Sequence, residues 1–102
     1  MARFDVYRPT GRPASWLVDV QSGLLSELES RVSIPLLPLE SGRQDAIDRL
    51  MPVLGIEGRD FVLVKTDIAM VPTRLLGAPI TNIEAEHRDT ITAAMDFLFQ
   101  AY

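Results

Sequence analysis

The chain has 102 residues, enough for one domain, and its hydrophobic content of 47% is ordinary for a globular core. It contains no cysteine, which excludes a disulfide framework and a thiolate metal site. The formal net charge is -4 and the basic residues are scattered, whereas a nucleic-acid-binding domain usually shows a basic stripe. No apolar run approaches the roughly 20 residues of a membrane span, and the N-terminus lacks the apolar segment of a signal peptide. We therefore expect a single cytoplasmic domain, residues 1–102, without membrane contact.

The first third of the chain alternates polar and apolar residues, as strands do. Phe4 to Tyr7 and Trp16 to Gln21 follow this pattern, and the connection between them contains two prolines and a glycine. We expect these two segments to form a hairpin with a long connection. Arg31 to Leu36 predicts another strand, in which Pro35 lacks a donor and must face an edge or a bulge.

The middle of the chain predicts a loop and a second hairpin. The polar segment Glu40 to Arg49 is expected to be a solvated loop. Leu50 to Ile56 is apolar enough to be buried on both faces, although Pro52 favours an edge or a bulge. The tight-turn signal Glu57-Gly58 connects it to a strong strand signal, Arg59 to Thr66.

The last third predicts a short apolar segment and then a helix. The segment is Asp67 to Pro72, and the helix begins near Glu84 to His87 and continues to the C-terminus. Glu84 and Glu86 suit a helix N-terminus, where the macrodipole favours acids. Many short strands before one terminal helix indicate a mainly β (β-rich α+β) fold, a small antiparallel barrel or sandwich with a helix packed on it.

Asp89 to Tyr102 is amphipathic. Its apolar face has the spacing i, i+3, i+4, i+7 and consists of Ile91, Ala94, Met95 and Leu98. Phe97 belongs to neither face. It either fills a groove beside the helix or is presented to a partner.

The polar residues predict neither a catalytic nor a metal site. His87 is the one histidine of the chain, and no HxxxH or HxH spacing exists. A triad of Ser22, His87 and Asp67 can be written down, but nothing in the sequence brings the three together. Asp19 and Asp67 lie in apolar contexts, where a carboxylate can act as a base but more often satisfies turn amides. We therefore expect no enzyme activity and no cofactor.

Six pieces of the sequence carry a resemblance to a known family. They are FDVY at 4–7, LVDVQS at 17–22, RVSIPL at 31–36, LMPV at 50–53, TDIAMVP at 66–72 and Gly77. In this spacing they resemble the CcdB family, toxins of plasmid toxin–antitoxin pairs that poison DNA gyrase. The resemblance covers the whole chain, and VDVQS and TDxAxVP are its specific parts. It implies a homodimer of SH3-like barrels, each with a C-terminal helix, a fold shared with the MazF and Kid ribonucleases.

The resemblance also implies partners. A CcdA-like antitoxin would wrap the toxin with a disordered segment and neutralise it. The complex of the two would repress its own operon, with operator DNA contacted only through the antitoxin. The target would be the gyrase A subunit, held in its DNA-cleaved state.

The family's gyrase contacts can be carried over to this chain by position. They fall on an apolar pair after VDVQS and on the end of the helix, namely Leu24, Leu25, Asp96, Phe99, Gln100, Ala101 and Tyr102. Leu24, Leu25 and Phe99 match the family pattern. The family ends in Trp-Gly-Ile, whereas this chain ends in Gln-Ala-Tyr, and Asp96 stands where the family has an asparagine. Met70 and Val71, an apolar pair before a proline, are the candidates for the dimer interface, although core packing is the commoner role for either one alone.

Two alternative functions remain open. The changed terminus motivates a non-toxic or retargeted homologue that still binds an antitoxin. The shared fold motivates a ribonuclease of the MazF or Kid kind, although the chain lacks a basic surface and an Arg/His cluster.

Overall fold

The computed structural model describes residues 2–9, 16–21, 29–39 and 51–100, and the bounds of its elements are as follows. The strands are β1 (Asp5–Tyr7), β2 (Trp16–Asp19), β3 (Ser30–Pro38), β4 (Val53–Ile56), β5 (Arg59–Leu63), β6 (Ala69–Pro72) and β7 (Thr81–Asn82). Two short 3-10 helices, η4 (Lys65–Asp67) and η5 (Thr73–Leu75), flank β6, and α1 (Glu84–Gln100) follows β7.

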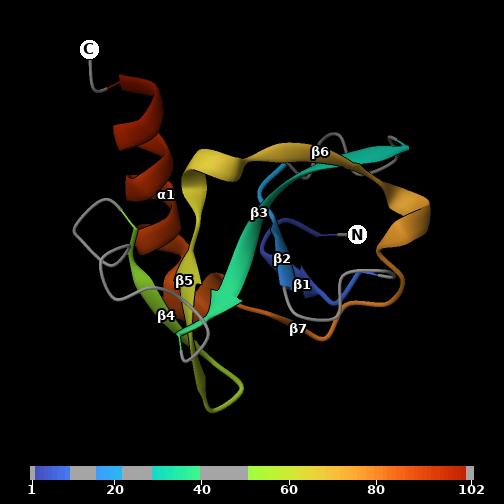
Figure 1. Cartoon of the computed structure of the whole chain (residues 1–102), viewed down its shortest axis with the longest axis horizontal. Helices are drawn as coiled ribbons and strands as arrows, with labels where there is room; N and C mark the ends of the chain where they lie inside the picture. The colour runs from blue at the N-terminus through green and yellow to red at the C-terminus, as the bar shows by residue number, and fades with distance from the viewer. Residues whose placement is uncertain (1, 10–15, 22–28, 40–50, 101–102) are drawn as a thin grey trace.

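The described strands form one antiparallel sheet that curls into a partial barrel (Figure 1). Its order is β4-β5-β3-β2-β1-β7, and β6 pairs with β3 beside this path. Figure 1 shows α1 standing beside β4 and β5 at one side of the molecule, with its C-terminal end at the outer margin. The mainly β fold with a C-terminal helix is therefore confirmed.

β3 is the long inner strand on which the barrel is built. It pairs with β2 along one edge, and along the other it pairs first with β6 and then with β5. Pro35 lies between these last two pairings, and its carbonyl accepts a hydrogen bond from the N–H of Val64 at 3.0 Å. The N and O atoms of a strand residue point to the same side. The side of Pro35 that lacks an N–H therefore faces the gap between β6 and β5. Pro35 is tolerated there although β3 is an inner strand of the sheet.

Both predicted hairpins are present. β1 pairs with β2, and β4 pairs with β5 through a turn in which Glu57 has φ 54° and Gly58 has φ 80°. Two successive positive φ values are typical of the type I′ turn, whose twist matches that of a hairpin. The prediction that the β4 segment is buried on both faces is wrong. Leu54 and Ile56 are buried, but Val53 is exposed, because β4 is the outer strand that Pro52 had indicated.

The helix begins at Glu84, within the predicted stretch, and Glu84 and Glu86 lie in its first turn. The side-chain oxygen of Asn82 accepts the N–H of Glu84 at 3.0 Å, which satisfies one of the free donors at the helix start. Three of the four residues of the predicted apolar face are confirmed, since Ile91 and Ala94 are buried and Met95 packs against the core. The fourth, Leu98, is partly buried.

The sheet is buried on two sides. The main core lies between the curled sheet and α1 and includes Trp16, Val18, Ile34 and Phe61, and the rings of Trp16 and Phe61 are 4.6 Å apart. A smaller cluster of Tyr7, Leu17 and Leu76 packs separately from it. In the described part of the chain, no helix has the length and apolar character needed to cross a membrane.

Candidate functional site

Of the residues predicted to contact gyrase, those whose side chains the structure describes lie at the end of α1. Asp96 and Phe99 are exposed and lie three residues apart, so they share one face of the helix. Phe99 has 66% of its surface exposed, which is unusual for a large apolar ring. Gln100 is the last residue of α1, and Leu24, Leu25, Ala101, Tyr102 and the side chain of Gln100 lie outside the described residues. The structure therefore brings two of the seven predicted contact residues together and does not test the others.

The two candidates for a dimer interface differ from each other. Met70 is 62% exposed on β6, whereas Val71 is partly buried and packs against the cluster of Tyr7, Leu17 and Leu76. Successive side chains of a strand point to opposite sides, which explains the difference. Met70 is accessible to a partner, and Val71 contributes to packing within the chain.

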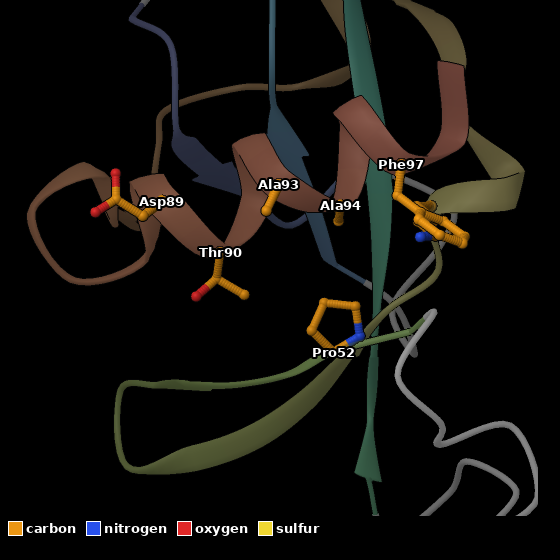
Figure 2. A pocket seen from close by; sticks show the side chains of 7 residues that line it. Pro52, Asp89, Thr90, Ala93, Ala94 and Phe97 are labelled. Carbon is orange, nitrogen blue, oxygen red and sulfur yellow. The ribbon is translucent and has the colours of Figure 1, made fainter. Parts of the chain in front are cut away.

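A groove of about 530 Å³ lies between α1 and the start of the β4–β5 hairpin (Figure 2). Its lining consists of Pro52, Lys65, Asp89, Thr90, Ala93, Ala94 and Phe97. Lys65 is 97% buried at this site, its relative exposure being 3%, and its Nζ atom lies 4.5 Å from the centre of the Phe97 ring. Phe97, which the sequence placed on neither face of the helix, thus lies over a buried ammonium while half of its own surface stays exposed. Phe97 lines the groove without filling it, so neither interpretation of this ring is confirmed.

Lys65 was not singled out from the sequence. The strand signal of Arg59 to Thr66 runs through it, and in a continuous strand Lys65 would share the face of Phe61 and Leu63. In the structure β5 ends at Leu63, and the turn of η4 carries Lys65 beneath α1. The signal that the sequence offered for this residue is that Lys65 is the one lysine of the chain, beside nine arginines.

A second polar cluster is buried between β1, β2 and β3. Asp19 and Arg31 are both fully buried and paired, with Arg31 Nε 2.7 Å from Asp19 Oδ2. The backbone N–H of Gln21 donates to Asp19 Oδ1 at 2.9 Å, and Gln21 Oε1 accepts the N–H of Val32 at 2.9 Å. Asp19 is therefore an ion-paired structural group that also satisfies a turn amide, which is the commoner of the two roles expected for it.

Tyr7 belongs to the same buried region. Its hydroxyl donates to Asp5 Oδ2 at 3.3 Å. Burial, followed by the negative charges of Asp5 and Asp19, raises the pKa of Tyr7 to about 12. The phenol is therefore neutral across the physiological range and acts as a hydrogen-bond donor.

The remaining candidates for chemistry are Asp67, His87 and Ser22. Asp67 is exposed in η4, and His87 Nε2 lies 2.8 Å from the carbonyl oxygen of Gly55 on β4. Ser22 lies outside the described residues, so the triad as a whole is not tested. Among the described residues, no group of three or more His, Cys, Asp or Glu side chains is placed to hold a metal ion.

The fold is that of a small, partial β-barrel with a C-terminal helix whose end is exposed. A family model described as CcdB protein matches residues 3–101. The chain therefore belongs to the CcdB family, and this membership supports a CcdB-like toxin. Comparison with curated proteins found no match.

Proposed function

We propose that this protein is the toxin of a type II toxin–antitoxin system that binds the gyrase A subunit and traps the gyrase–DNA cleavage complex. The observation that carries the proposal is the family match over residues 3–101. The exposed ring of Phe99 at the end of α1 supports it, because an apolar ring held on a rigid helix is a suitable anchor for a protein partner.

Poisoning of this kind requires no bond to be made or broken by the toxin. A protein that binds the cleaved state of gyrase more tightly than the other states raises the population of the cleaved state. The size of the shift is set by the ratio of its affinities for the two states. The proposed role of α1 is to supply this differential affinity. The protein is accordingly proposed to act as a ligand of an enzyme and not as an enzyme.

The proposal includes the partners that the family implies. In the cytoplasm the protein would form a homodimer, with Met70 at the contact, and a CcdA-like antitoxin would neutralise it. The toxin–antitoxin complex would repress its own operon, with the antitoxin making the contacts to operator DNA. The exposure of Met70 on β6 supports its place in the dimer contact.

Purified protein, gyrase and supercoiled plasmid test the central claim. We expect linear, protein-linked DNA to accumulate, and we expect Phe99→Ala to weaken the effect about 30-fold or more, as for a hot-spot residue worth about 2 kcal/mol. Phe97→Ala is the matched control, because it removes a ring from the other side of the same helix. Absence of cleavage complexes with folded wild-type protein would contradict gyrase poisoning, and translation arrest without DNA damage would point to a ribonuclease.

A non-toxic or retargeted homologue is the second candidate, and the terminal Gln-Ala-Tyr sequence favours it. A tryptophan in this position can stack on a cation for about 1–2 kcal/mol, which a glutamine cannot do. If the terminus is the cause, the triple variant Gln100→Trp, Ala101→Gly, Tyr102→Ile gains toxicity that the wild type lacks. A triple variant that stays harmless would show that the difference lies elsewhere.

A further inference from the structure

The last turn of α1 extends beyond the core that holds the rest of the helix. Among the described side chains of α1, Ala94 is the last buried one, and Phe99 follows it by about 7.5 Å along the helix axis. Figure 1 shows the end of α1 rising past the segment that joins β5 to β6. The last carbonyl groups of a helix have no partner within it, so an end that leaves the core opens easily. A fixed position of Phe99 therefore requires a contact that holds the last turn.

Lys65 supplies such a contact. Its Nζ atom lies 4.5 Å from the centre of the Phe97 ring, and its side chain is buried, with a relative exposure of 3%. The residues of the last turn itself, 97–100, include no lysine or arginine. Lys65 thus brings a cation from another element to the end of the helix, where both the ring face and the macrodipole favour a positive charge.

Lys65 is in turn held by the sheet. It is the first residue of η4, and of the described elements η4 makes the most extensive contact with α1. The N–H of Val64, the residue before it, donates to the carbonyl oxygen of Pro35 on β3 at 3.0 Å. Ile68, which follows η4, packs against the main core. A chain of contacts therefore runs from the inner strand β3 through Lys65 to the last turn of α1.

The two rings of the last turn lie on different sides of the helix. Two positions along a helix correspond to a rotation of about 200°, so a Phe97 ring fixed over Lys65 directs Phe99 away from η4. Figure 2 shows Phe97 on the side of α1 that faces the groove. Phe99 is the more exposed of the two, at 66% against 51%. The contact with Lys65 therefore fixes the rotation of the last turn as well as its position.

We propose that Lys65 is a positioning residue for the target surface at the end of α1. It acts through Phe97: the contact between ammonium and ring keeps the last turn helical and holds the Phe99 side chain outward. A surface that is ordered before binding avoids the entropy cost of being ordered by its partner. The inference rests on the proposed function for the identity of the target, whereas the link between Lys65 and the last turn can be measured without any target.

Amide hydrogen exchange of the whole protein measures the opening of the last turn. Lys65→Met keeps an apolar side chain and loses the charge. We expect amides 97–100 of this variant to exchange about 2- to 30-fold faster, the factor that corresponds to one cation–π contact, and residues 87–94 to exchange as in the wild type. Lys65→Arg restores a cation and should restore the wild-type rate. Arg88→Gln removes an exposed cation of the same helix and is the control that should leave amides 97–100 unchanged.

Phe97→Leu shows whether the ring carries the effect. This variant should open the last turn about as much as Lys65→Met. The double variant should open it no further than either single one, because each single change already removes the same contact. If Lys65→Met does not fold, the pair Phe97→Leu and Lys65→Arg carries the test, with the last turn open in the first variant and closed in the second.

Three exchange results would overturn the proposal. The last turn could stay closed in Lys65→Met or in Phe97→Leu, or the effects of the two changes could add in the double variant. Faster exchange could also spread to residues 87–94, which would show that Lys65 supports the packing of the whole helix and not the position of its end.

The gyrase cleavage assay gives a second readout. Apparent affinity falls with the fraction of molecules whose last turn is ordered, so Lys65→Met should weaken the accumulation of linear DNA about two- to fivefold, and Lys65→Arg should not. The same small loss is expected of Phe97→Ala, well short of that of Phe99→Ala, which removes the contact itself. If the wild type poisons gyrase and an open last turn leaves poisoning unchanged, Lys65 does not position the target surface. If the wild type forms no cleavage complexes, gyrase poisoning fails, and hydrogen exchange alone decides whether Lys65 fixes the last turn.

Discussion

Two buried cations in this protein are stabilised in different ways. Arg31, fully buried beneath the sheet, is ion-paired with Asp19 at 2.7 Å, and the carboxylate also accepts the N–H of Gln21. Lys65, almost as deeply buried, lies over a ring at the edge of a groove. The first charge has a counter-charge within the fold, whereas the second lies against the face of an aromatic ring. Burial alone therefore does not determine how a charge is stabilised, and the partner of the charge must be known as well.

Removing the anion beneath the sheet is expected to have the largest effect. Asp19→Asn leaves the Arg31 cation buried without a counter-charge, and loss of one member of a buried pair costs about 3–5 kcal/mol. The free energy of unfolding from urea denaturation measures this change. The protein concentration must be held fixed, because the stability of any oligomer depends on it.

The double variant Asp19→Leu, Arg31→Met serves as the control for that experiment. It removes both charges, and we expect it to be more stable than Asp19→Asn alone, since an apolar pair of similar volume often replaces a buried ion pair without loss. If the single variant is as stable as the wild type, the carboxylate does not compensate Arg31 and the contrast with Lys65 fails.

The next effect concerns Tyr7, which lies beside the same buried acids. Its pKa in the folded protein is raised to about 12 from an ordinary value of 10.0. Unfolded chains therefore release this proton at lower pH than folded ones. The stabilisation is fully present below about pH 10 and is lost as the pH rises through 12, a change of about 2.7 kcal/mol.

In the variant Tyr7→Phe, the free energy of unfolding should no longer fall between pH 10 and about 12, because phenylalanine has no proton to release. Tyr102→Phe, which changes the other tyrosine, is the matched control and should keep this fall. A wild type and a Tyr7→Phe variant with identical stability curves between pH 9 and about 12 would show that the phenol is not perturbed.

Lys65 is expected to contribute less to stability than Asp19, although it is nearly as buried. Lys65→Met loses a cation–π contact worth about 0.5–2 kcal/mol but also removes a desolvated charge, so the free energy of unfolding should change by less than about 1 kcal/mol. Urea denaturation beside Asp19→Asn makes the comparison direct. A loss as large as that of Asp19→Asn would show that the ring face stabilises the ammonium as well as a carboxylate stabilises Arg31.

The strands and the helix could be predicted because each depends on a local period in the sequence. The apolar face of α1 and the Glu57-Gly58 turn are each determined by residues that lie close together in the sequence, and the structure contains both. The exposure of Val53 could not be read in this way. It depends on β4 being the edge strand, which Pro52 indicated but the apolar composition of the segment did not.

The candidate site was less predictable for the same reason. The pairing of Asp19 with Arg31 follows from the β2–β3 register, in which Asp19 is opposite Ser33. The burial of Lys65 requires α1 to cover η4, a long-range contact that no local pattern records. Phe97 appeared unexplained along the helix because its neighbour, Lys65, is distant in sequence.

The smallest effect belongs to a third cation, Arg88, which is exposed on α1. It forms an i, i+4 pair with Glu84 at 3.3 Å, and such exposed pairs contribute about 0.3–0.5 kcal/mol. Arg88 also lies near the helix N-terminus, where the macrodipole disfavours a cation and offsets part of that gain. We therefore expect Arg88→Gln to change the free energy of unfolding by less than about 0.5 kcal/mol at low salt, and by still less at high salt, where screening weakens both terms. A salt-independent loss of about 1 kcal/mol or more in the free energy of unfolding would mean that an exposed cation stabilises this fold as much as a buried one. The partner and the burial of a charge would then not determine its contribution to stability here.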